Sequence, residues 1–362
     1  MKNFKLDKLK KLVAVIILPQ MSIREAFAKM DADNVRLLCI MEDHKYRGIL
    51  SAGDIQRAII GNKSLDTPVI DVIRTEKVRL GHEGDSAEEV KALMLKFRTE
   101  FMPMLNDAGE LVEVYFWDDV FTSEKPKQDQ IDLPVVIMAG GKGTRLKPFS
   151  NILPKPLFPL GGKTIVETIM DKFHDMGCHR FYFSVNHKAN FIRSYFDHLE
   201  ENPYKIDYFK EDEPLGTAGS LHLIKDKISE TFFVSNCDIV IDADYSEILD
   251  YHREQQNEIT MVCSLKYIKI PYGTVETSEG GQVTSLLEKP ELTYKINTGL
   301  YLLEPHLLEE IPENSFYHIT DLIDDVRVRG GRVGAFPISE KSWCDIGEWA
   351  EYKRTLGVLG FS

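Results

Sequence analysis

One feature constrains the fold of this 362-residue chain more than any other: from residue 133 onward, short apolar runs alternate with helical patterns. The apolar runs have strand length and cover residues 135–138, 181–185, 232–235 and 259–264. The segments with helical periodicity cover residues 165–176, 190–199, 218–224 and 245–252. Such alternation predicts an α/β, Rossmann-like fold with a largely parallel, mixed sheet and helices on both faces. Ligands of such sheets bind at the carboxyl ends of the strands, so we expect the site on the loops there.

The first 122 residues show a different pattern, a weak internal repeat of helix, strand, strand and helix. Each copy begins with a polar capping segment before a helix, Ser22 in the first and Asp85 in the second. A hairpin follows each helix, over residues 35–50 and 101–116. The interval from Asp54 to Asp119 nearly equals the interval from Ser22 to Asp85. The spacing predicts a duplicated α+β unit ahead of the α/β region.

This unit resembles the cystathionine-β-synthase-type (CBS) domain, and the resemblance covers residues 8–122 as a tandem pair. In that family a Ser/Thr-x-x-Asp at the hairpin exit holds the ribose of an adenine nucleotide, and Ser51 with Asp54 matches it. The second copy has Phe116 in place of the hydroxyl, so the resemblance implies one adenosine site. Alternatively, Asp54 only caps the helix that follows. Paired CBS modules also stack in that family, which implies a homo-oligomer.

We therefore expect a tandem CBS region at residues 1–122, a linker at 123–132 and an α/β domain at 133–362. The linker carries no apolar periodicity. The apolar run at residues 12–18 is too short to span a bilayer, and no small-residue cleavage site follows it. A buried strand is expected there rather than a signal peptide.

Charge and cysteine content limit the partners. The chain has 44 Lys and Arg against 57 Asp and Glu, a net charge of −13. A surface of this sign disfavours nonspecific binding to nucleic acid or to anionic membrane, so we expect neither as a partner. An anionic ligand must then be held by a local positive site. The five scattered cysteines include no C-x-x-C pair, which suits a reducing compartment and predicts the cytoplasm.

The first strand of the α/β region leads into a glycine-rich loop, Ala139-Gly140-Gly141-Lys142-Gly143-Thr144-Arg145. Its glycines let backbone N–H groups approach an anion closely, and Arg145 adds a charged fork matched to phosphate oxygens. A triphosphate is the expected ligand. Leu146 takes the place of the last glycine of a dinucleotide fingerprint, and Leu157 the place of the first glycine of a P-loop. Both of those commoner phosphate motifs are excluded.

Lys155 follows the loop, with Pro154 and Pro156 on its two sides. The prolines predict a stiff, extended segment in which the ammonium has little freedom to lose on binding. A fixed positive charge near a phosphate loop suits neutralisation of an anion. The alternative is a solvated surface lysine.

Together these motifs resemble the sugar-1-phosphate nucleotidylyltransferase family, and the resemblance runs from Pro134 nearly to the end of the chain. Further matches occur in the family's order, at residues 213–219, 236–238, 272–275, 288–290, 297–299 and 343–347. Cys237 departs from the family pattern, which has Gly or Ala beside the metal aspartate. The departure implies a change in packing rather than in chemistry.

The resemblance implies transfer of a nucleotidyl group to a sugar-1-phosphate with release of pyrophosphate, assisted by Mg²⁺. Asp238 and Asp345 would hold the metal, although each aspartate alone is equally well explained as a turn or cap residue. Arg145 would clamp the β- and γ-phosphates, Lys155 would neutralise the reacting phosphates and Lys289 would hold the sugar phosphate. The residues implied in nucleotide binding are Ala139, Gly140, Gly141, Gly143, Thr144, Glu211, Pro214, Gly216 and Thr217. Those implied in sugar binding are Gly273, Glu288, Asn297 and Gly299.

Glu211 gives the one chemical indication of the base. It lies five residues before Gly216, where uridylyl and thymidylyl relatives commonly have Gln and GDP-mannose-type relatives commonly have Glu. Guanine offers two adjacent N–H donors that a carboxylate accepts together, whereas uracil offers one donor between two acceptors. GTP is therefore favoured. The alternative is that Glu211 is a solvated member of the acidic stretch 211–213.

The sequence gives less information about the sugar substrate than about the base. A CBS pair ahead of a guanylyl-type transferase resembles the GDP-glucosamine-forming enzymes of bacterial legionaminic acid synthesis, which implies glucosamine-1-phosphate. Guanylyl transfer to mannose-1-phosphate or heptose-1-phosphate, and uridylyl or thymidylyl transfer to glucose-1-phosphate, are alternatives. A different class is an inactive nucleotide-sensing protein, whose mark would be the loss of a metal aspartate or a phosphate lysine. All of these residues are present.

Overall fold

The computed structural model describes residues 11–33, 35–43, 45–73, 80–97, 101–116, 120, 130–211 and 213–358. The chain divides into two compact units, Met1–Gln128 and Asp129–Ser362. Residue 119, at the end of the predicted repeat, and residues 123–129 of the predicted linker lie outside the described residues. None of the described helices has the length and hydropathy needed to cross a bilayer.

The first unit contains the same supersecondary structure twice. The first copy consists of β1 (Ile16–Ile17), α2 (Ile23–Asp33), β2 (Leu37–Glu42), β3 (Lys45–Ser51) and α3 (Ala52–Ile60), followed by η1 (Val69–Asp71). The second consists of β4 (Gly81–His82), α4 (Ala87–Phe97), β5 (Phe101–Leu105) and β6 (Leu111–Phe116). In each copy a parallel pair of strands is followed by an antiparallel hairpin. The parallel pair of the first copy aligns Ile16 with Cys39, and that of the second copy aligns Gly81 with Met104. The first helix and the hairpin of the predicted repeat are present in both copies, and its closing helix is described in the first copy, as α3.

Two details of this unit differ from expectation. The capping residue of α4 is Ser86 and not Asp85. The N–H and hydroxyl of Ser86 donate to the Glu89 carboxylate, as those of Ser22 donate to Glu25 in the first copy. The Asp85 carboxylate instead accepts the His82 N–H at 2.7 Å. The strand expected over residues 12–18 is reduced to β1, because residues 11–15 are helical. In this short helical segment Val15 is buried, whereas Val13 is 63% exposed.

The second unit is a seven-stranded sheet with the order β11-β10-β7-β12-β17-β14-β18. All neighbours are parallel except those of β17, which runs antiparallel to β12 and β14. The strands are β7 (Val135–Met138), β10 (Arg180–Val185), β11 (Lys205–Lys210), β12 (Phe232–Asn236), β14 (Ile259–Lys269), β17 (Glu291–Leu303) and β18 (Val333–Ile338). The predicted class, a largely parallel mixed sheet, is confirmed.

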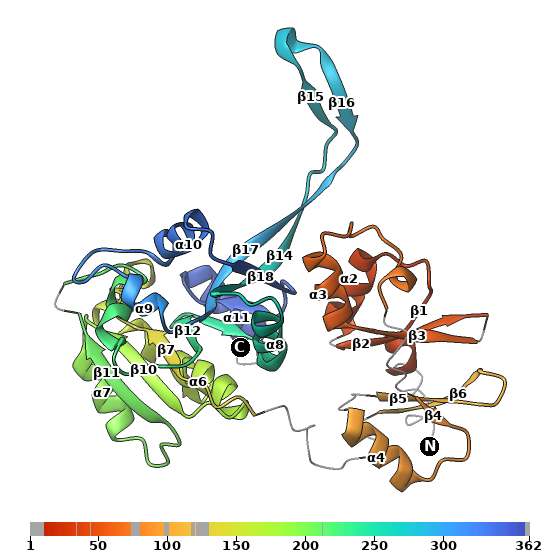
Figure 1. The fold of residues 1–362 in the computed structure, drawn as a ribbon, viewed down its shortest axis with the longest axis horizontal. Helices are drawn as coiled ribbons and strands as arrows, with labels where there is room; N and C mark the ends of the chain where they lie inside the picture. Colours follow the sequence, from red (N-terminus) through yellow and green to blue (C-terminus); the bar gives the residue numbers. More distant parts are fainter. Residues whose placement is uncertain are drawn as a thin grey trace. The chain divides into compact units, whose positions relative to one another are not determined.

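Helices cover both faces of this sheet (Figure 1). Side chains alternate along β7, so Val135 and Ile137 pack into one core cluster and Val136 into the other. The first cluster contains residues of α6 (Ile165–Asp175), α7 (Ala189–Asp197), α8 (Tyr245–Glu254) and α11 (Trp349–Val358). The second contains residues of η5 (Gly219–Ile224), α9 (Leu307–Glu310) and α10 (Ile319–Val328). The helix expected over residues 218–224 is the short 3₁₀ helix η5, which begins at Gly219.

Short elements connect this framework to its loops. The 3₁₀ helices η2 (Thr144–Leu146), η3 (Phe149–Asn151) and η4 (Lys155–Leu157) follow β7, and the small pair β8 (Pro159–Leu160) and β9 (Lys163–Thr164) precedes α6. A second pair joins β13 (Ile239–Ile241) to β19 (Trp343–Asp345). Parts of three motifs lie on these elements: the glycine-rich loop on η2, the Lys155 segment on η4 and residues 343–345 on β19.

A two-stranded arm leaves the sheet (Figure 1). β14 pairs with β18 only over residues 259–264, and beyond Ser264 its ladder continues with β17 alone, to Lys269 opposite Glu291. The arm ends in the hairpin of β15 (Thr274–Thr277) and β16 (Val283–Leu287), whose turn contains η6 (Glu279–Gly281). The sequence pattern predicted the first half of β14 and missed this extension.

Candidate active site

The glycine-rich loop follows β7 directly, as predicted, and is tied to the neighbouring strand by the Ala139 N–H, which donates to the Ser184 carbonyl at 2.9 Å. Gly143 has φ 61°, and a Cβ there would lie 3.3 Å from the Lys155 Cβ. A Cβ on Gly140 would lie 2.9 Å from Glu211 Oε1, whereas one on Gly141 would meet nothing within 4 Å. The loop therefore packs against Lys155 and Glu211, the residues predicted to bind phosphate and base.

Arg145 lies on η2, where its side chain is 64% exposed and its Nη1 is 3.4 Å from Glu348 Oε1. Glu348 is 60% exposed, and an ion pair so open to solvent restrains its partners weakly. The guanidinium thus remains available to an anion arriving at the loop.

Lys155 is 7% exposed and forms an ion pair with the Asp238 carboxylate. The expected extended segment is instead the 3₁₀ helix η4, because Pro154 has an extended backbone but Pro156 is accommodated at the second helical position. The alternative of a solvated surface lysine is wrong. A buried ammonium persists because a carboxylate accompanies it.

The two predicted metal ligands lie close to each other although they are far apart in the sequence: Asp345 ends β19, and Asp238 lies in the turn directly before β13, the strand that pairs with β19. Ile239, next to Asp238, is opposite Asp345 in the β13–β19 ladder, and the Ile346 N–H donates to the Asp238 carbonyl at 2.8 Å. The Gly347 N–H donates to Asp345 Oδ1 at 2.6 Å and fixes that carboxylate. The two carboxylates are hard oxygen donors suited to Mg²⁺, which takes one or two carboxylates and completes its shell with phosphates and water. These residues fit the metal.

Cys237 is enclosed by protein, and burial, followed by the neighbouring Asp238 charge, raises the pKa of its thiol to about 12. A neutral thiol is a poor ligand for a hard cation. The residue therefore acts in packing, as its departure from the family pattern implied.

Glu211 is 5% exposed, so the alternative of a solvated acidic residue is wrong. Ser184 Oγ donates to Oε1 at 2.6 Å, and the Leu215 N–H donates to Oε2 at 3.1 Å. The carboxylate thus supports the loop that follows it while lying against Gly140. Asp212, in the same acidic stretch, lies outside the described residues.

The predicted base loop is closed by a segment that the sequence analysis did not identify. Gly216 has φ 84°, and a Cβ there would lie 2.5 Å from the Tyr317 carbonyl oxygen. That carbonyl accepts the N–H groups of Ala218 and Gly219, each at 3.0 Å, and Thr217 Oγ1 accepts the Ile319 N–H at 2.9 Å. Pro214 is exposed on the same loop. Because Tyr317 acts through its backbone, no side-chain motif could have revealed it.

Two of the predicted sugar residues, Asn297 and Gly299, lie within β17. Asn297 Oδ1 accepts the Gly299 N–H at 3.1 Å, and its Nδ2 donates to the Tyr301 hydroxyl at 2.8 Å. Gly299 has φ 89°, and a Cβ there would lie 2.4 Å from Asn236 Nδ2. Asn297 and Gly299 are thereby placed beside the Asn236-Cys237-Asp238 segment.

The other sugar residues are on the arm, between its two ladders. A Cβ on Gly273 would lie 3.1 Å from Glu288 Oε2, and Lys289 follows with a positive φ of 48°. Within the described part of the chain, no hydrogen bond or ion pair joins Gly273, Glu288 or Lys289 to the residues around Lys155. The structure thus brings together the nucleotide and metal residues but does not bring the arm residues to them.

In the first unit, Ser51 and Asp54 form a capping box at the start of α3. The Ser51 N–H donates to Asp54 Oδ2 at 2.8 Å, and Ser51 Oγ accepts the Asp54 N–H at 3.1 Å. Asp54 is 6% exposed and also pairs with Arg57. The cap interpretation of Asp54 is confirmed, and its role toward a ribose stays a prediction.

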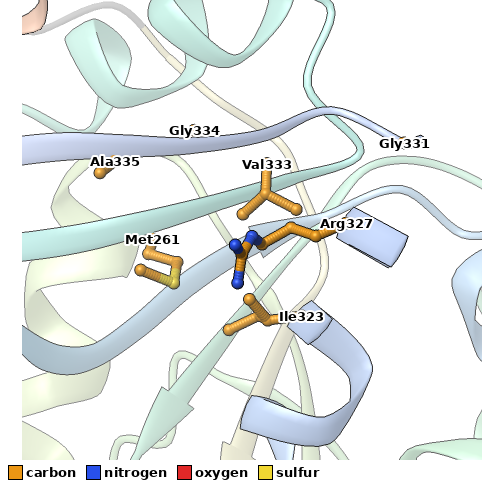
Figure 2. A pocket seen from close by; sticks show the side chains of 7 residues that line it. All are labelled: Met261, Ile323, Arg327, Gly331, Val333, Gly334 and Ala335. Carbon is orange, nitrogen blue, oxygen red and sulfur yellow. The ribbon is translucent and has the colours of Figure 1, made fainter. Parts of the chain in front are cut away.

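Two further features, a pocket and a cluster of acidic residues with a histidine, lie outside this site. A shallow pocket of about 460 Å³ lies between α10 and β18 and contains none of the predicted residues (Figure 2). Glu258, His306 and Glu310 also converge, but Arg329 donates to both carboxylates, at 3.1 and 2.9 Å, and takes the place a metal would need. Hydrogen bonds from Arg329 are the main cause that lowers the pKa of Glu258 to about 2.

Comparison with known proteins agrees with this geometry. The family described as "Nucleotidyl transferase" matches residues 134–356, and the CBS domain family matches residues 12–61. The crystal structure of HddC from Yersinia pseudotuberculosis is 28% identical, with a TM-score of 0.50, and covers 63% of this chain and 99% of that one. The second predicted CBS copy has the fold of the first but lies outside the matched residues.

Curated relatives carry different specificities. A mannose-1-phosphate guanylyltransferase of Mycobacterium tuberculosis is 30% identical over 187 residues, which is 51% of this chain and 52% of that protein. A UTP–glucose-1-phosphate uridylyltransferase of Synechocystis is 29% identical over 246 residues, 63% of each chain. A mannose-1-phosphate guanylyltransferase catalytic subunit beta of Drosophila pseudoobscura is 33% identical over 182 residues, 49% of each chain. The chain thus spans about half to two thirds of the length of these relatives.

Proposed function

Because the chain belongs to the nucleotidyl transferase family, we propose that it joins a nucleoside triphosphate to a sugar-1-phosphate, forming a nucleotide sugar and pyrophosphate. The observation that carries this proposal is the convergence of Lys155, Asp238 and Asp345 beside the glycine-rich loop. Both reactants are anions, so catalysis rests on alignment and on positive charge rather than on a covalent intermediate. The attacking phosphate is already ionised at neutral pH and needs no general base.

Each residue has a separate task. The backbone N–H groups around Gly141 bind the triphosphate, and the exposed Arg145 clamps its terminal phosphates. Lys155, fixed by its burial, keeps a positive charge beside the reacting phosphates. Asp238 and Asp345 would hold Mg²⁺, which when bound lowers the repulsion between the two anions.

For the nucleotide we propose GTP. Glu211 accepts one hydrogen bond on each oxygen, and a carboxylate has about four lone-pair positions, so capacity remains for the adjacent guanine donors. Two observations on other proteins support this: HddC has a structure complexed with GMP-PN, and several relatives are guanylyltransferases. UTP is the second candidate, favoured by the uridylyltransferase relative.

For the sugar we propose glucosamine-1-phosphate, with mannose-1-phosphate or heptose-1-phosphate as the alternatives. Support for mannose comes from the guanylyltransferase relatives, whereas support for glucosamine comes from the CBS unit ahead of a guanylyl-type transferase. We also propose that the CBS unit binds an adenine nucleotide at Ser51 and Asp54. A cytoplasmic setting is proposed from the five free thiols.

A matrix of nucleoside triphosphates against sugar-1-phosphates, read by magnesium-dependent pyrophosphate release, tests these proposals. GTP with glucosamine-1-phosphate is expected to give the highest kcat/KM. If kcat/KM is highest with mannose-1-phosphate or heptose-1-phosphate, that sugar phosphate replaces glucosamine-1-phosphate as the assigned substrate. If it is highest with UTP, the assigned nucleotide is UTP and not GTP. If no combination of substrates releases pyrophosphate, the protein belongs to the inactive, nucleotide-sensing class.

A further inference from the structure

The segment that follows β19 contacts two of the predicted functional residues. The Gly347 N–H donates to Oδ1 of Asp345, the carboxylate predicted to bind the metal, at 2.6 Å. The next residue is Glu348, whose Oε1 lies 3.4 Å from Nη1 of Arg145. Among the described residues, no other ion pair or side-chain hydrogen bond involves Glu348 or Arg145. Glu348 thus gives Arg145 a negative partner at the place where phosphates are expected.

Glu348 and a phosphate compete for the same donors. A guanidinium binds carboxylate and phosphate through one planar set of N–H groups, so a donor engaged with Glu348 is not free for a phosphate oxygen. The contact is weak, because the side chains of Arg145 and Glu348 are 64% and 60% exposed. A triphosphate carries several negative charges and is therefore the stronger partner for Arg145.

A stack of aromatic rings ties the first turn of α11 to η3. The rings of Trp349 and Phe149 have centroids 5.1 Å apart and planes 9° apart. Trp349 also stacks on Tyr352, at 5.4 Å and 26°. Tyr352 is buried, and its hydroxyl donates to the Pro159 carbonyl at 2.5 Å. Because Phe149 is close to Arg145 in the sequence, this anchor limits how far the segment that bears the arginine can move.

We propose that Glu348 is a counter-ion that occupies Arg145 until the terminal phosphates of the nucleotide displace it. The stack of Trp349 on Phe149 holds the arginine in place during this exchange. Glu348 therefore weakens the binding of the triphosphate and of pyrophosphate, whereas the stack strengthens both. These residues act through Arg145 and position it. The proposal rests on the proposed function, in which Arg145 clamps the terminal phosphates.

Calorimetry of the full chain with Mg²⁺ and three ligands, pyrophosphate, GTP and GMP, tests the counter-ion. Glu348→Gln keeps the shape of the side chain and removes its charge, so the Kd of pyrophosphate and of GTP should fall by about two- to fivefold, the range of an exposed ion pair. The Kd of GMP should not change, because GMP lacks the terminal phosphates. High salt should reduce the gain in affinity, since it screens exposed charges.

Two controls isolate the contact with Arg145. Glu351→Gln removes a carboxylate of the same helix that pairs with Arg354 at 2.7 Å, and it should leave the Kd of all three ligands unchanged. In an Arg145→Ala background, Glu348→Gln should no longer improve the binding of pyrophosphate, because the counter-ion then has no arginine to release.

Trp349→Leu tests the stack. The variant stays apolar but lacks the stacked ring, so the Kd of pyrophosphate and of GTP should rise by about three- to tenfold, the range of an aromatic pair, while that of GMP stays the same. Trp349→Phe should restore binding. Adding Phe149→Leu to Trp349→Leu should cause little further loss, because the two rings act as one unit. Urea unfolding checks that each variant stays folded.

An unchanged or raised Kd of pyrophosphate in Glu348→Gln would overturn the counter-ion role, as would an equal gain in the Arg145→Ala background. Equal losses of GMP and pyrophosphate binding in Trp349→Leu would refute the positioning role of the stack. Absence of pyrophosphate binding by the wild type would overturn the whole proposal. These measurements need no turnover, so a chain that shows the expected changes but is inactive with every substrate pair would refute the transferase activity and keep this inference.

Discussion

The buried ammonium of Lys155 pairs with the carboxylate of Asp238, which lies far along the chain. The pair links the segment after β7 to the turn after β12, where the residues predicted to bind the nucleotide and the metal meet. Single and double substitutions of these two residues can therefore distinguish a loss of activity from a loss of stability.

Asp238→Asn should lower turnover by about 100-fold or more, and the fold should persist with reduced stability, because the buried Lys155 ammonium loses its anionic partner. Lys155→Met should also abolish turnover and should destabilise the protein by about 2 to 3 kcal/mol, because it leaves a partly buried carboxylate without its partner. The double variant should recover much of that stability and none of the activity. Urea unfolding and pyrophosphate release measure the two effects. Equal stability of Lys155→Met and the wild type would contradict an energetic role for the pair.

Glu211→Gln should lower the preference for GTP over UTP by about tenfold or more, because an amide offers one acceptor and one donor in place of two acceptors. The measurement is the ratio of kcat/KM for the two nucleotides. Ser184→Ala is the control, since it removes a donor to Glu211 without altering the carboxylate. If the control shifts the ratio as much as Glu211→Gln, the residue supports the loop and does not read the base.

Gly216→Ala should raise the KM for the nucleotide by about tenfold, the equivalent of ~1.4 kcal/mol. Its Cβ would collide with the Tyr317 carbonyl at 2.5 Å and displace the loop. Gly280→Ala is matched in backbone, with φ 81° against 84°, but its Cβ would meet nothing within 4 Å. The control should leave the KM unchanged, and a similar rise in both variants would point to backbone strain alone.

The pKa of Glu258, lowered to about 2 by Arg329 first and then by His306, predicts a pH dependence. A carboxyl whose pKa falls on folding stabilises the native state above its unfolded pKa, so this contribution is lost as pH falls from about 4.5 toward 2. Glu258→Gln should therefore destabilise the protein at pH 7, and its difference from the wild type should shrink in acid. Urea unfolding between pH 3 and 7 measures this, and Glu309→Gln, exposed on α9, serves as the control. A difference that is constant over this range would refute the linkage.

Asp54→Ala should lower the stability of the first unit by about 1 kcal/mol through loss of the capping box. If Asp54 also holds a ribose, calorimetry of the full chain should show an adenine nucleotide binding to the wild type and not to the variant. Glu25→Ala removes a like capping box at α2 and should leave that binding unchanged. Equal binding to all three proteins would limit Asp54 to capping.

The sequence was most informative where local pattern and motif coincide. Residues 135–138 were predicted as a strand and are β7, and the loop after them contacts Lys155 and Glu211 as the motifs required. Tyr317 was missed because it acts through a carbonyl, to which any residue type contributes equally. The arm was missed because strand periodicity ends at Ser264 in the part of β14 that the sheet buries, whereas the exposed extension is held by cross-strand pairing with β17. Lys155 was expected to be extended because prolines disfavour helix, yet one 3₁₀ turn tolerates them.

The loop around Gly216 is closed by Tyr317, and Asp238 gains its neighbour only when β19 pairs with β13. During synthesis on the ribosome, a nascent chain that has emerged as far as residue 310 already holds the glycine-rich loop, Lys155 and Asp238 but lacks both partners. A closed Gly216 loop and a paired Asp238 segment thus require that residues 317–319 and 343–345 have already been made.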